Sequence, residues 1–162
     1  MTSTETLPLI PVRLDFDGLV PAFSRAVTAL DDAATAELDR AGIPAGLREL
    51  VRLRASQING CAYCVDLHSR AAGEAGVPAQ LVHAVAIWPD SGLFTAAERA
   101  ALALTESVTR LSETHVPDEV VAEATAAWGE EGTAALLALL VSINAWNAIG
   151  VTARCWPVRR KG

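Results

Sequence analysis

Residues 49–68 read ELVRLRASQINGCAYCVDLH and contain the most informative pattern in this 162-residue chain. Cys61 and Cys64 are three residues apart, and His68 follows Cys64 by four. On a helix these side chains share one face, and the i, i+4 spacing puts the imidazole beside the second thiol. The Asn-Gly pair at 59–60, directly before them, is a typical turn signal. The stretch therefore predicts a helix, a turn and a second helix whose first turn carries two thiols.

Glu49 lies nearly as far before this turn as His68 lies after it. If the two helices pack antiparallel, a rise of about 1.5 Å per residue leaves them on the order of 3 Å apart along the common axis. Glu49 can then orient His68 or accept its proton, and His68 can deprotonate Cys64. A thiol needs such help, because only the thiolate is nucleophilic and free cysteine has a pKa of about 8.5. The pattern indicates a nucleophile, its base and an orienting acid.

The two thiols are expected to divide the chemistry. Cys64, beside His68, is predicted to attack a peroxide and become a sulfenic acid. Cys61, expected at the solvent edge of the helix, is predicted to donate a proton and then resolve the sulfenic acid as a disulfide. An external dithiol would reopen that disulfide, and no other cofactor or metal is expected.

Composition limits the class of protein. Hydrophobic residues make up 51% of the chain but aromatic residues only 5%, so alanine, leucine and valine dominate, and alanine and leucine favour helices. The net charge of -6 and a pI near 5.0 argue against nucleic-acid binding. Residues 134–151 are apolar enough to resemble a membrane span, but Ser142, Asn144 and Asn147 interrupt them, so we expect a buried or interface helix. No membrane association and a cytoplasmic location are expected.

Proline and glycine divide the chain into about seven predicted helices, and no alternating strand pattern is visible. We therefore expect an all-α fold in a single domain, residues 1–162, with an irregular start at 1–17 and a short basic tail at 157–162. The last helix is apolar around most of its circumference, which favours a homo-oligomer whose subunits cover it. The helices are expected at about 21–40, 44–58, 61–73, 78–85, 96–113, from 117 and from 131 onward.

The spacing Glu49-x11-Cys61-x2-Cys64-x3-His68 resembles that of the AhpD-like alkylhydroperoxidases of the carboxymuconolactone decarboxylase superfamily. The resemblance extends from about Gly42 to Asn147. It implies an all-helical protomer that forms trimers or hexamers and reduces organic hydroperoxides in antioxidant defence. It also implies that the four spaced residues form a proton relay. One position departs from the best-studied peroxidases, which have a histidine where this chain has Tyr63.

Other interpretations of the same residues stay open. A carboxymuconolactone-decarboxylase-like acid–base enzyme would use the same fold without needing two thiols. A non-catalytic redox sensor would form the disulfide without turnover, and a zinc site would need further ligands. Tyr63, Trp146 and Asn144 are candidates to line a pocket, although Trp146 and Asn144 are at least as compatible with core packing.

Overall fold

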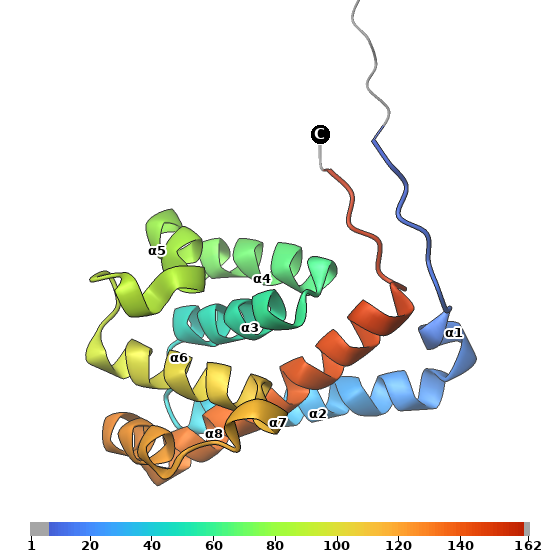
Figure 1. Cartoon of the computed structure of the whole chain (residues 1–162). Coiled ribbons are helices and arrows are strands. Elements are labelled where there is room, and N and C mark those ends of the chain that lie inside the picture. Colours follow the sequence, from blue (N-terminus) through green and yellow to red (C-terminus); the bar gives the residue numbers. More distant parts are fainter. Residues whose placement is uncertain (1–6, 161–162) are drawn as a thin grey trace, which may run out of the picture.

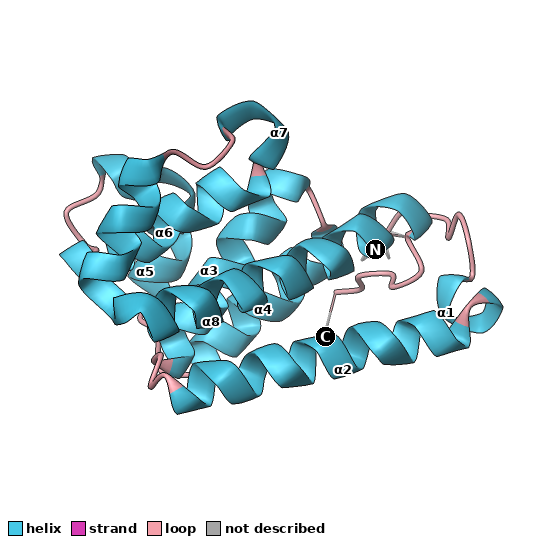
Figure 2. Cartoon of the chain, turned by 90° about the horizontal axis from the view of Figure 1, so that it is seen from below, coloured by secondary structure: helices cyan, strands magenta, loops and turns pink. Residues whose placement is uncertain are grey.

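The computed structural model describes residues 7–160, which form a bundle of helices with no strand among them (Figures 1 and 2). The all-α prediction is confirmed. The elements are α1 (Phe16–Leu19), α2 (Pro21–Arg40), α3 (Ala45–Asn59), α4 (Ala62–Glu74), α5 (Ala79–Ala84), the 3-10 helix η1 (Val85–Asp90), α6 (Ala96–Thr109), α7 (Leu111–Thr114) and α8 (Asp118–Ala153).

The predicted helix–turn–helix is formed by α3 and α4, which lie side by side in Figure 1. Gly60 ends α3 in the left-handed conformation, with φ of 72°, which glycine adopts without the penalty of a Cβ. Cys61 then caps α4, because its sulfur accepts a hydrogen bond from the backbone N–H of Cys64 at 3.4 Å. The turn and the cap together place both thiols at the N-terminal end of α4.

Most helix boundaries fall where proline, glycine and capping residues predict them. Thr95 and Glu98 form the expected capping box of α6. One boundary differs from expectation: the helix predicted to reach residue 113 is interrupted at Arg110. The two helices predicted after Pro117 correspond to the two parts of α8, which a kink at Gly129 (φ 71°, ψ 171°) separates just before the predicted start of the second helix.

The first described segment of the chain lies beside the end of its last helix. The expectation of an irregular segment over 1–17 is wrong at its end, because Phe16 and Asp17 belong to α1; its first six residues lie outside the described part. The segment before α1 lies beside the end of α8, where the backbone N–H groups of Arg13 and Leu14 donate to the Ala153 carbonyl. Residues 157–160 of the predicted tail have no helix, and its last two residues lie outside the described part.

The core lies where α2, α3, α6 and α8 converge. Leu38, Val51, Leu139 and Leu140 in this cluster are each completely buried. By length and composition alone, α8 is apolar enough to cross a membrane. Because its buried face packs on α2, α3 and α6, as a core helix does, this is weak evidence for a span.

Candidate active site

A pocket of about 470 Å³ brings Cys64 and His68 of α4 together with side chains from α1, α2, α3, α8 and the C-terminal segment. Its volume is in the range of small-molecule sites. Tyr63, Trp146 and Trp156 give it an aromatic wall. The remaining lining residues are Asp17, Ser24, Arg25, Thr28, Asp31, Arg52, Leu67 and Ile143.

Cys61 and Cys64 are not joined by a disulfide in this structure, and their pKa values move in opposite directions. The pKa of Cys61 falls to about 7, because the Cys64 thiol donates a hydrogen bond to its sulfur; backbone N–H groups and the Asn147 amide reinforce the effect, and burial opposes it. The same hydrogen bond and burial raise the pKa of Cys64. The first negative charge of the pair is therefore favoured on Cys61, at the helix N-terminus.

The thiol that ionises more readily is not the thiol that can be reached from the pocket. Cys61 is 1% exposed, so the expectation that it lies at the solvent edge of the helix is wrong. It faces α8 instead: a Cβ added to Gly150 would lie only 2.8 Å from the Cys61 sulfur. Cys64 is also buried, but it lines the pocket, whereas Cys61 does not. A molecule in the pocket therefore meets Cys64 first.

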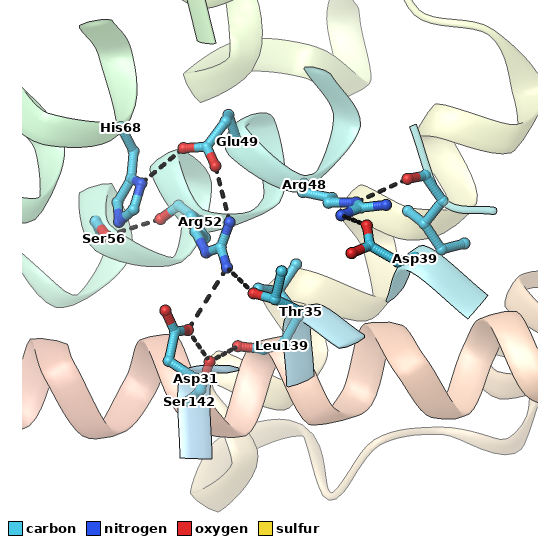
Figure 3. A network of polar contacts seen from close by, with 11 residues as sticks. Asp31, Thr35, Asp39, Arg48, Glu49, Arg52, Ser56, His68, Leu139 and Ser142 are labelled. Carbon is cyan, nitrogen blue, oxygen red and sulfur yellow. Dashed lines mark hydrogen bonds and ion pairs between the residues drawn. The ribbon is translucent and has the colours of Figure 1, made fainter. Parts of the chain in front are cut away.

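Glu49 and His68 meet as their spacing predicts. His68 Nδ1 lies 2.8 Å from Glu49 Oε2 across the α3–α4 interface (Figure 3). Burial raises the pKa of Glu49, but the hydrogen bonds from His68 and Arg52 and their charges outweigh it, so the pKa lies below its ordinary value. A carboxylate can only accept, so Nδ1 carries the hydrogen, and in the neutral ring Nε2 has the free lone pair.

His68 and Cys64 were predicted to be in direct contact, and the structure places them on the same pocket. Both side chains line the pocket, but none of the hydrogen bonds among residues 7–160 joins them directly. Proton exchange between the two would therefore require a movement of the side chains or a bridging water. The roles of Cys61, Cys64, His68 and Glu49 stay predictions.

A layer of amides lies on the far side of the thiols. Asn147 donates from Nδ2 to Ser56 Oγ at 3.0 Å, and Asn59 Nδ2 donates to Asn144 and Asn147 at 2.8 and 3.0 Å. The prediction that Asn144 lines the pocket with the thiols is wrong: it borders a separate hollow, because α8 turns that face away from Cys64. Tyr63 and Trp146 do line the pocket with Cys64.

Trp156 is the main residue of the pocket that the sequence pattern does not indicate. It follows the end of α8, and its indole N–H donates to Asp17 of α1 at 2.8 Å. Its ring centre lies 5.4 Å from that of Tyr63 and 5.6 Å from that of Trp146. Nothing local in the sequence brings residues 17, 63 and 156 together. Among residues 7–160, no group of three histidine, cysteine or acidic side chains lies close enough to hold a metal ion.

The helical fold and its Cys-x-x-Cys helix define an AhpD-like protein. The chain belongs to the carboxymuconolactone decarboxylase family, whose model matches residues 21–107. It is 35% identical over 104 residues to the uncharacterized protein YdfG of Bacillus subtilis (strain 168), covering 64% of this chain and 71% of that protein.

Two solved structures have a similar fold. The first is ATU0492 of Agrobacterium tumefaciens, a protein of unknown function for which a role as the antioxidant defence protein AhpD has been suggested. It has a TM-score of 0.85 and 31% identity over 92% of this chain and all of that one. The debrominase Bmp8 has a TM-score of 0.72 at 24% identity, over 85% of this chain and 72% of that one, and is similar in fold alone.

Proposed function

We propose that this protein is a dithiol peroxidase that reduces organic hydroperoxides and is recharged by an external dithiol. The observation that carries the proposal is the placement of Cys64 and His68 on one aromatic-walled pocket, with Cys61 directly behind Cys64. The suggested antioxidant role of ATU0492 supports it. The aromatic wall favours an apolar, preferably flat, organic group over hydrogen peroxide.

The proton of Cys64 must first leave its sulfur. The Cys61 thiolate is the nearest acceptor, because it already receives the Cys64 S–H hydrogen bond. His68 can take the proton instead through Nε2, while Glu49 stabilises the resulting imidazolium. Either route leaves a thiolate on Cys64, facing the pocket.

The Cys64 thiolate then attacks the outer oxygen of the hydroperoxide. The S–O bond forms as the O–O bond breaks, and the group that took the proton returns it to the departing alkoxide as an alcohol. Cys61, as thiolate, attacks the sulfenic sulfur; the S–S bond forms as the S–O bond breaks, and the departing hydroxide takes up from solvent the proton that Cys61 had released, leaving as water. The peroxide is reduced by two electrons and the thiol pair is oxidised by two.

An external dithiol completes the cycle by thiol–disulfide exchange through a mixed disulfide. Such donors persist in reducing compartments, so the cycle is best suited to the cytoplasm. The donor must reach Cys64 through the pocket, since Cys61 lies behind it.

A stoichiometric assay tests the proposed function. The reduced protein should consume one equivalent of cumene hydroperoxide per chain and lose two hydrogen atoms in mass, because one disulfide forms. Peptide mapping should place that disulfide between Cys61 and Cys64, with Cys155 still free. An excess of dithiol should then sustain many turnovers. A chain that forms the disulfide but never turns over would be a redox sensor, and one that leaves the peroxide intact would contradict the proposal outright.

We also propose that the protein works as a homo-oligomer, a trimer or hexamer. Large apolar side chains are exposed on the N-terminal segment, on α2 and on α8, including Leu9 at 77%, Phe23 at 58% and Val141 at 50%. Such a surface is unusual for a monomer and typical of a subunit interface. Light scattering should give a mass of several times 17.0 kDa. Phe23→Ser should lower that mass, whereas a monomeric wild type would contradict the proposal.

A further inference from the structure

We propose that Arg52 and Asp31 are positioning residues of the thiol site: Arg52 holds Glu49, and Asp31 holds Arg52, so that Glu49 presents its second oxygen to His68 (Figure 3). The inference rests on the proposed function, in which His68 exchanges a proton at the pocket. It extends the site from α3 and α4 to α2 and α8.

The carboxylate of Glu49 divides its two oxygens between two partners. Oε1 accepts from Arg52 Nη1 at 2.8 Å, while Oε2 accepts from His68 Nδ1 at 2.8 Å. The position of Arg52 therefore determines how the carboxylate is turned. If Arg52 were missing, Glu49 could rotate about its terminal bond, and His68 Nδ1 would lose a fixed acceptor.

Arg52 is itself held on its other side. Its Nη2 lies 3.4 Å from the Thr35 hydroxyl and 3.5 Å from Asp31 Oδ1, both on α2. Ser142 of α8 donates to the same Asp31 oxygen at 2.7 Å. A planar guanidinium can serve Glu49, Thr35 and Asp31 at once, which a lysine ammonium on a flexible stem cannot do with the same geometry.

Burial of Arg52 and Glu49 increases the free-energy cost of breaking this network. Arg52 is only 9% exposed, and the side chain of Glu49 only 14%. Leaving either charge without its partner in such a place is costly, so the network has few alternative arrangements. Arg52 and Asp31 also line the pocket that contains Cys64 and His68, so the network borders the reacting groups.

A second arginine shows what a structural ion pair between the same two helices looks like. Arg48, one turn earlier on α3, contacts Asp39 of α2 at 2.6 Å and the Ile43 carbonyl at 2.7 Å (Figure 3). Among the hydrogen bonds and ion pairs of residues 7–160, none joins Arg48 to Glu49 or His68, and Arg48 does not line the pocket. Arg48 and Asp39 therefore supply matched controls for Arg52 and Asp31.

Histidine side-chain nitrogen NMR tests the inference without reference to turnover. The chain has three histidines, and the spectrum of His68→Ala identifies the His68 signals. The neutral wild-type ring should carry its hydrogen on Nδ1. Arg52→Gln should give a mixture of the two tautomers, and Arg52→Lys should give a smaller change. Asp31→Asn is a milder change that should also give a mixture of tautomers, and it serves as the test if Arg52→Gln does not fold. Arg48→Gln and Asp39→Asn should leave the ring as in the wild type.

Peroxide turnover supplies the second measurement. In Arg52→Gln, kcat should fall by about 10-fold to 100-fold, the scale of a misplaced catalytic group, with KM nearly unchanged. The acid side of the pH profile should move to higher pH. The charged groups around Glu49 are His68 on α4 and Arg52 on α3, with Asp31 on α2 behind it, so removing Arg52 raises the pKa of Glu49.

The two proposals fail in different ways. An unchanged His68 tautomer in both Arg52→Gln and Asp31→Asn overturns the positioning role, as does an equal change in Arg48→Gln. A wild type that holds the Nδ1–H tautomer, loses it in Arg52→Gln and yet reduces no hydroperoxide supports the positioning role and contradicts the peroxidase.

Discussion

Cys64→Ser is expected to abolish dithiol-dependent reduction of cumene hydroperoxide, with kcat/KM at least about 10³-fold below the wild type. Cys64 is the thiol that borders the pocket, and a serine hydroxyl cannot be oxidised to a sulfenic acid. The remaining Cys61 does not line the pocket and lies against Gly150, so we expect that it does not take over the attack. A coupled assay that follows oxidation of the dithiol measures the loss.

Cys61→Ser should separate the first step from the second. The variant should react once with the hydroperoxide and stop at the Cys64 sulfenic acid, which a sulfenic-acid probe labels and mass spectrometry locates. Cys155→Ser is the control and should turn over normally, because Cys155 does not line the pocket. The opposite pattern, with a single turnover in Cys64→Ser and none in Cys61→Ser, would make Cys61 the nucleophile. This alternative is chemically reasonable, because a pKa of about 7 favours the thiolate form of Cys61.

His68→Ala is expected to lower kcat/KM by about 100-fold at neutral pH, the lower end of what general acid–base catalysis contributes. The variant loses the imidazole that we propose exchanges a proton with Cys64 and the departing alkoxide, and it leaves the buried Glu49 without one of its two partners. Turnover measured from pH 5 to 9 checks both the size of the loss and its pH dependence.

The same variant should leave the thiol titration almost unchanged. The pKa of Cys61 is lowered to about 7 by the Cys64 thiol, Asn147 and nearby backbone N–H groups, and His68 is not among these contacts. Since the pKa is lowered, thiolate absorbance should rise as the pH increases through about 7 in both proteins. His83→Ala, on the exposed face of α5, is the control for turnover. If His68→Ala titrates at the pH of an ordinary cysteine, His68 is a direct hydrogen-bond partner of the thiol pair.

The helix–turn–helix and its ends could be predicted because their causes are local. Gly60 ends α3 because glycine adopts the left-handed backbone conformation easily. Thr95 caps α6 in a capping box with Glu98, three residues later. The Glu49–His68 contact was also predictable. In two antiparallel helices joined by a short turn, residues at similar separations before and after the turn lie next to each other. Arg52 had a local signal as well, its i, i+3 spacing from Glu49.

Other parts of the site have no local cause. Cys61 was expected near solvent because it begins a helix, but the close approach of α8 at Gly150 buries it. Asn144 and Trp146 are two residues apart on α8, yet only Trp146 faces the pocket, because the packing of α8 determines which side it presents. Trp156 reaches the pocket through a hydrogen bond to Asp17, which lies 139 residues away in the chain.

The sequence by itself determined the helical class, the turn that joins α3 to α4 and the four residues whose spacing defines the thiol site. These depend on backbone preferences and helical periodicity, which act over a few residues. Only the tertiary structure decided which thiol borders the pocket and on which thiol the first negative charge is favoured. It also decided that Arg52, the partner of Glu49, contacts Asp31 of α2, which in turn accepts a hydrogen bond from Ser142 of α8. Those properties arise from burial and from contacts between helices distant in sequence, and periodicity along one helix does not contain them.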